Sequence, residues 1–147
     1  MGVRLSPERF GLATADVIDA FERLVATEAV DFIDLSLWDV FKEAASEEFA
    51  SRPLLELFTT LDRGSVRLAV AGHLYTGSDV QRALDGGADI VAIGRAAITN
   101  HDFPLLVQAD PTAAMRELPV ATETLAAEGL GPIFIDYMSN WKGFVGG

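Results

Sequence analysis

Cysteine is absent from this chain, and only two of its 147 residues are histidine, His73 and His101. The absence of cysteine excludes disulfide bonds and thiol catalysis, and it fits a cytoplasmic protein. Because the chain has only these two histidines, and no cysteine or histidine is clustered with another, we expect no metal site. The chain also lacks a run of about 18 apolar residues, so we expect no transmembrane helix. Its first residues, MGVRLSP, lack the apolar core of a signal peptide.

Basic residues are scarce as well. The chain has 11 lysines and arginines against 22 acids, which gives a formal net charge of −11. This balance argues against nucleic acid or an anionic membrane as a partner. Half of the residues are hydrophobic, which is enough for a packed core. No linker, low-complexity segment or sequence repeat divides the chain, so we predict a single domain over residues 1–147.

The most informative stretch contains two short apolar runs, Val66–Ala71 and Ile90–Ile93, which end at Gly72 and Gly94. Runs of this length that are rich in valine and isoleucine and bounded by glycine are typical of strands buried on both faces. We predict a helix between them, capped by Thr76 or Ser78 and stopped at residues 86–87, with Val80, Ala83 and Leu84 on one side. A strand, helix and strand in this order predict two parallel strands with a right-handed crossover.

Both glycine turns should then lie at the C-terminal edge of the sheet, where α/β proteins bind ligands. A glycine lets a ligand approach the backbone closely, and unpaired N–H groups at a helix start favour an anion. Arg95 adds a positive charge that can bind phosphate with two hydrogen bonds. The turns at Gly72 and Gly94 therefore indicate a phosphate site of the kind found after the last two strands of (β/α)8 barrels. The structural alternative is that both glycines only make tight turns and that Arg95 pairs with a surface carboxylate.

The other elements follow from the same rules. We expect strands at Met1–Leu5 and Val30–Ser36, and a helix at Thr14–Ala26 with Thr14 as its N-cap. Further expected helices are one starting at Pro53, a short turn at 96–99, one starting at Asp110–Pro111, one at 122–128 that Gly129 stops, and a final one at 132–141. The apolar residues of this last helix are expected to seal the outer layer, or else to form an interface. Trp38 is expected to pack in a loop, with substrate contact as the alternative.

Several of these motifs together resemble the Old Yellow Enzyme family of FMN-dependent NAD(P)H oxidoreductases. The stretch that contains Gly72, Thr76, Ala88-Asp89, Gly94-Arg95 and Asn100-x-Asp102-Phe103 resembles the family's seventh and eighth barrel strands. Gly2–Pro7 is similar to the fifth strand, Val30–Ser36 to the sixth, and 129–145 to the C-terminal segment. One departure is His101, which stands where the family usually has proline and should loosen the loop.

The resemblance implies an α/β fold that is the C-terminal half of a (β/α)8 TIM barrel, with four parallel strands and helices on the outside. In that alignment Met1 falls inside a barrel strand, and the first half of the barrel is expected before it. The cofactor would be FMN, with NAD(P)H as reductant and an activated alkene or similar small molecule as hydride acceptor. Gly72, Gly94 and the N–H groups of His73 and Arg95 would hold the phosphate.

Arg4 would stabilise negative charge on the flavin pyrimidine, and its alternative is a salt bridge on an edge strand. The family's substrate-binding histidine pair and proton-donating tyrosine belong to the missing half, so no catalytic residue is assigned, and whether the chain alone is an enzyme stays open. Since four strands cannot close a barrel, we expect a homo-oligomer or a separate N-terminal half as partner. The alternatives are a non-catalytic split-gene remnant or interaction module that keeps the phosphate cup, and a barrel enzyme that binds a phosphorylated substrate there.

Overall fold

The computed structural model describes residues 1–146. By its internal contacts the chain divides into two compact units. The first unit contains residues 1–74 and 80–92, and the second contains residues 75–79 and the chain from Ile93 onward. Along the chain the elements are β1 (Gly2–Leu5), α1 (Thr14–Ala26), β2 (Phe32–Ser36), η1 (Glu47–Phe49), α2 (Leu54–Thr59), β3 (Arg67–Ala71), α3 (Gly77–Asp85), β4 (Ile90–Ala92), α4 (Arg95–Thr99), α5 (Phe103–Ala109), β5 (Val120–Ala121), α6 (Thr122–Ala127), α7 (Pro132–Ser139) and β6 (Val145–Gly146).

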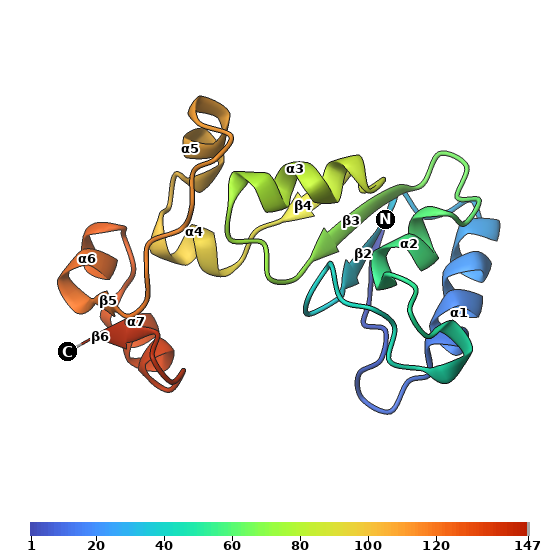
Figure 1. Ribbon diagram of the computed structural model, residues 1–147, viewed down its shortest axis with the longest axis horizontal. Coiled ribbons are helices and arrows are strands. Elements are labelled where there is room, and N and C mark those ends of the chain that lie inside the picture. Colours follow the sequence, from blue (N-terminus) through green and yellow to red (C-terminus); the bar gives the residue numbers. More distant parts are fainter. Residues whose placement is uncertain (147) are drawn as a thin grey trace. The chain divides into compact units, whose positions relative to one another are not determined.

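The first unit is built on a four-stranded sheet in the order β1-β2-β3-β4 (Figure 1). All neighbouring strands in it are parallel, and a helix lies in each connection between them. This is the strand order and direction of half a (β/α)8 barrel, so the predicted α/β fold class is confirmed. The Thr14–Ala26 helix has the predicted bounds, and the four strands lie within one or two residues of theirs.

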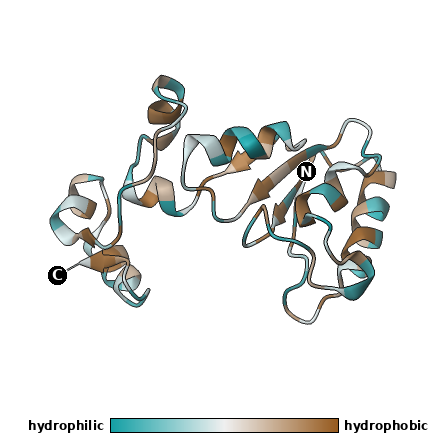
Figure 2. Cartoon of the chain, viewed as in Figure 1, coloured by the Kyte–Doolittle hydropathy of each residue, from teal (hydrophilic) through white to brown (hydrophobic). Residues whose placement is uncertain are grey.

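One face of this sheet forms the core of the first unit. Ile33, Leu35, Leu68 and Val70 point to it and are fully buried. The helices supply the matching apolar residues, with Phe21 of α1 and Phe58 of α2 in ring contact at 5.8 Å between centroids. In Figure 2, hydrophobic and hydrophilic stretches alternate along α1, as expected for a helix with one side against this core. The core therefore lies between the sheet and its crossover helices, as in other parallel sheets.

The other face of the sheet is partly open. Phe32 and Ile90, which point away from the helices, keep 40% and 45% of their surface exposed. Both β1 and β4 are edge strands, because each pairs with a single neighbour in the sheet. An open apolar face between two unpaired edges is the condition under which strands pair with another chain.

The second unit has a separate small core. Its buried residues come from β5, α6, α7 and the position just before β6, and they are Val120, Leu125, Ile135, Met138 and Phe144. The strands β5 and β6 pair in parallel, and the sequence did not predict them. No helix in the described part of the chain has both the length and the apolarity needed to cross a bilayer.

Three predictions of local structure were wrong. Thr14 is the first helical residue, and Ala13 stands at the cap position. The Thr14 hydroxyl donates to Glu8 at 3.1 Å, and the same carboxylate oxygen accepts the Ala45 N–H. No helix begins at Asp110, which instead ends α5 and accepts a hydrogen bond from the Thr112 N–H. The apolar residues of α7 do not all seal an outer layer, since Ile133 is 87% exposed. Only Ile135 and Met138 of that helix are buried.

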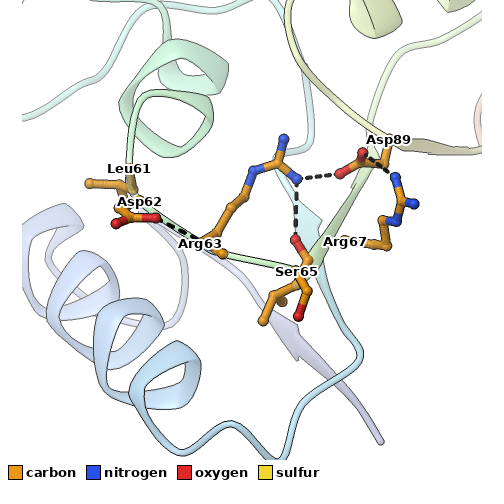
Figure 3. Close-up of a pocket in the computed structure, with 8 residues that line it drawn as sticks. Leu61, Asp62, Arg63, Ser65, Arg67 and Asp89 are labelled. Carbon is orange, nitrogen blue, oxygen red and sulfur yellow. Dashed lines mark hydrogen bonds and ion pairs between the residues drawn. The ribbon is translucent and has the colours of Figure 1, made fainter.

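At the N-terminal edge of β3 and β4, the carboxylate of Asp89 binds three groups, and Figure 3 shows two of them, Arg63 and Arg67. It accepts the Leu68 N–H at 2.8 Å and forms ion pairs with Arg67, at 3.1 Å, and with Arg63. Arg63 also donates to the Gly87 carbonyl oxygen at 3.0 Å. The Leu68 N–H and then the two arginines lower the pKa of Asp89 from 3.8 to about 2.

We predict that Asp89→Asn lowers the free energy of unfolding by about 2 kcal/mol at pH 7, because two arginines lose their charged partner. Since the folded pKa lies below the unfolded one, the carboxylate stabilises the fold above about pH 4, and this contribution is lost as the pH falls toward 2. Urea denaturation at pH 7 and pH 3 should therefore show a smaller difference from the original chain at pH 3. The control is Asp85→Asn, which alters only a surface contact with Gln81. Equal effects of the two substitutions would contradict the prediction.

Candidate functional site

The C-terminal edge of the sheet is where the sequence places the candidate site. Ala71 and Ala92 are register partners, so β3 and β4 end level with each other. Gly72 follows β3 directly, and Gly94 follows β4 after one intervening residue. Gly72 and His73 belong to the first unit, whereas Gly94 and Arg95 belong to the second.

Gly72 is required by close packing against the loop after β2. Its φ of +143° is in the region that residues with a side chain rarely adopt, and an added Cβ would lie 2.5 Å from the backbone carbon of Trp38. The carbonyl oxygen of Gly72 accepts the Val40 N–H at 3.3 Å, so the two loops are joined. The glycine therefore has a structural reason that does not involve a ligand. His73 follows with φ +49°, and its Nδ1 lies 3.5 Å from a carboxylate oxygen of Asp39.

Gly94 has different surroundings. No heavy atom lies within 4 Å of the position that a Cβ would take. Its carbonyl oxygen accepts the N–H groups of Ala97 and Ile98, so it acts as the N-cap residue of α4. The space beside Gly94 is open to an approaching group, which is the property that a ligand-binding glycine needs.

Arg95 is the first residue of α4, and its guanidinium is held by two aromatic residues. Nη1 donates a hydrogen bond of 2.8 Å to the Tyr75 hydroxyl, and the guanidinium carbon lies 5.1 Å from the ring centroid of Trp141. The alternative that Arg95 pairs with a surface carboxylate is not what the described residues show, because none of their ion pairs includes it. The sequence did not indicate either aromatic contact.

Arg4 lies on the open face of the sheet, beside Asp34, its register partner in β2. Its Nε is 3.1 Å from a carboxylate oxygen of Asp34, and the arginine side chain is 58% exposed. The second oxygen of Asp34 is buried without a hydrogen-bond partner. The salt bridge that was the alternative role for Arg4 is thus present. The flavin role stays a prediction, which the terminal nitrogens of Arg4 could still serve because the ion pair uses Nε.

Beyond α4, the loop at residues 100–102 is fixed by side chains. The Asn100 amide oxygen accepts the Thr99 hydroxyl and the Arg116 N–H, both at 3.0 Å. The N–H of His101 donates to Glu128 at 2.8 Å, and the ring Nδ1 of His101 lies 2.7 Å from the same oxygen. The expectation that His101 loosens the loop was wrong, because the bond from its N–H to Glu128 is one that proline cannot make.

His101, Asp102 and Glu128 are also the one group of possible metal ligands among the described residues. Glu128 is, however, already bound by the N–H and ring of His101 and by Arg116. These groups lower the pKa of Glu128 to about 2, and the Glu128 carboxylate raises the pKa of His101. The arrangement is an ion-pair network that joins the loop to the end of α6, and nothing further points to a cation.

Comparison with known proteins gives a distant similarity. No family model matches the chain. The chain is 26% identical, over 136 residues, to a protein of Klebsiella pneumoniae (strain 342) named NADH:fumarate oxidoreductase. The matched region covers 88% of this chain but 14% of that protein, so the chain is similar to a small part of a much longer polypeptide.

We predict that Gly72→Ala lowers the free energy of unfolding by about 2 kcal/mol or more, because the new methyl group would meet the backbone of Trp38 and the φ is unfavourable. The matched control is Gly131→Ala, since residue 131 has extended φ and ψ and open space around its Cα. Urea unfolding, followed by circular dichroism, measures both. A loss for Gly131→Ala as large as that for Gly72→Ala would show that the close approach to Trp38 is not the cause.

Proposed function

We propose that this chain is the FMN-binding part of an NADH- or NADPH-dependent oxidoreductase of the Old Yellow Enzyme type. The observation that carries the proposal is the similarity, along 88% of the chain, to a protein named NADH:fumarate oxidoreductase. The family resemblance of the motifs at both glycine turns also supports it. The parallel strand order agrees with a barrel, in which such turns bind phosphate.

The residues around Gly94 fit a phosphate group. The space beside Gly94 is open, and Arg95 has no carboxylate partner among the described residues. We propose that the N–H and guanidinium of Arg95 bind the phosphate of FMN, and that the N–H of His73 contributes from the turn at Gly72.

Arg4 would bind the pyrimidine edge of the flavin, where its permanent charge opposes the negative charge of the reduced ring. When bound, FMN supplies the chemistry, namely transfer of a hydride from NAD(P)H to an activated alkene or similar acceptor. The chain's own residues bind and orient the cofactor, and no side chain is assigned a proton-transfer role. The cytoplasmic location stays a prediction.

One observation favours a second candidate. Arg4 already has a carboxylate partner in Asp34, so the phosphate cup could serve a phosphorylated substrate without any flavin contact by Arg4. The two candidates differ in whether the isoalloxazine ring contributes to binding.

The test is a titration of the purified chain with FMN, followed by flavin fluorescence, with riboflavin as the analogue that lacks phosphate. We expect micromolar binding of FMN, weaker binding of riboflavin, and a loss of about 30-fold or more in FMN affinity for Arg95→Ala. The control Arg23→Ala removes the same charge from an exposed pair in α1 and should change nothing. Absence of FMN binding by the folded chain would contradict the proposal and leave the non-catalytic module as the better description. Competition by phosphorylated sugars with no riboflavin affinity would favour the second candidate.

We also propose that the open sheet is completed by a second copy of the chain or by a separate N-terminal half. The exposed Phe32 and Ile90 and the two unpaired edges support this. Analytical ultracentrifugation of the 15.8 kDa chain should show a dimer or larger species. Phe32→Ser should weaken this association, whereas Phe10→Ser, at a 91% exposed loop position, should not. A stable monomer that unfolds cooperatively would overturn self-association, and failure of Phe32→Ser to differ from Phe10→Ser would exclude this face.

A further inference from the structure

The surroundings of Arg95 contain more than a phosphate-binding arginine needs. Its guanidinium has five N–H groups, one of which is donated to the Tyr75 hydroxyl at 2.8 Å. The ring of Trp141 lies 5.1 Å from the guanidinium carbon, within the range of a cation–π contact. These two contacts restrict a side chain that otherwise has considerable rotamer freedom. Arg95, Tyr75 and Trp141 all belong to the second unit.

Tyr75 is itself fixed by its backbone. Its N–H donates to a carboxylate oxygen of Asp79 at 3.1 Å, and its carbonyl oxygen accepts the Met115 N–H at 2.8 Å. The same Asp79 oxygen accepts the Thr76 N–H, and the Thr76 hydroxyl accepts the Asp79 N–H, which makes a capping box at the start of α3. The chain is therefore held on both sides of Tyr75, and its hydroxyl is presented at a defined position.

Trp141 is fixed from the other direction. The backbone N–H of Trp141 donates to the Met138 carbonyl oxygen at 3.0 Å, at the end of α7. Its ring contacts Phe144 edge to face at 6.3 Å, and Phe144 is part of the buried core of the second unit. A second ring, that of Tyr137, lies 6.5 Å away on the preceding turn. The indole ring that contacts the Arg95 guanidinium is thus itself held in place by neighbouring aromatic rings.

The partners of Arg95 are unusual for a chain with this excess of acidic residues. Acids outnumber bases by 22 to 11, yet Arg95 has aromatic partners and no carboxylate among the described residues. A carboxylate would neutralise the guanidinium and compete with an anionic ligand. A hydroxyl and a ring face orient it without removing its charge.

We propose that Tyr75 and Trp141 are positioning residues that hold Arg95 ready for the phosphate of FMN. This inference rests on the proposed function and adds two residues to its binding site. Tyr75 acts through the orientation of Arg95 and does not itself serve as a proton donor. Trp141 supports the guanidinium plane, so its fluorescence should report on ligands that bind Arg95.

The first experiment compares FMN and riboflavin affinities of Tyr75→Phe with those of the original chain. FMN affinity should fall about tenfold, because the lost hydrogen bond is to a charged group. Riboflavin affinity should stay the same, since it lacks the phosphate. In the Arg95→Ala background, Tyr75→Phe should have no further effect on FMN binding. The control Tyr137→Phe removes a hydroxyl from a neighbouring exposed tyrosine and should leave both affinities unchanged.

A purely structural role for Tyr75 would lower both affinities equally or act additively with Arg95→Ala, and either result would overturn the proposal. If the original chain binds FMN and Tyr75→Phe binds it equally well, the positioning role is wrong while the proposed function stands. Circular dichroism of each variant confirms that it is folded.

The second experiment does not require flavin. In Trp38→Phe, Trp141 is the remaining tryptophan, and its fluorescence is followed during titration with inorganic phosphate. We expect a saturable change that is lost in Arg95→Ala and shifted to higher phosphate concentration by Tyr75→Phe. If FMN does not bind, the proposed function fails, but this response would still support positioning of Arg95 toward an anion. No response to phosphate, or a response unaffected by Tyr75→Phe, would overturn it.

Discussion

The parallel register of β3 and β4 is the constraint on which the candidate site depends. Asp89 fixes it at the N-terminal edge by accepting the N–H of Leu68 in β3 from its place just before β4. Arg63 and Arg67 complete the connection by pairing with the same carboxylate. Because the two strands start from this point in register, they also end level, at Ala71 and Ala92. The stabilising ion pairs and the turns proposed to bind the ligand thus belong to opposite edges of the sheet, a division that is typical of barrel proteins.

Residues with local causes were predictable from the sequence. The apolar stripe of α1 indicated its bounds. Thr76, one of the two candidate caps of α3, accepts the Asp79 N–H with its hydroxyl as a cap does. The wrong predictions depended on distant partners. Glu8, which accepts the Thr14 hydroxyl, also binds Lys42 and the Ala45 N–H, and Thr14 enters α1 as its first helical residue, one position after the cap.

In the candidate site, too, the features with local causes were predictable from the sequence and those that depend on distant residues were not. The positions of Gly72 and Gly94 after two strands followed from the apolar runs, but the reason for each glycine did not. Gly72 avoids the backbone of Trp38, which is 34 residues earlier in the sequence, whereas the space at Gly94 is open. The contact between Arg95 and Trp141 joins residues 46 positions apart, and no sequence period links them. Such pairs become visible only when the chain is folded.

The bond from His101 to Glu128 makes the effect of a substitution at one of these positions depend on the other. A proline at 101 would remove the N–H donor, and a carboxylate at 128 would then lose the backbone bond that most lowers its pKa. Arg116 would remain as a partner of Glu128 among the described residues. Substitution of Glu128 should therefore cost more stability in this chain than in a variant with proline at 101, because in the variant the bond from residue 101 is already missing.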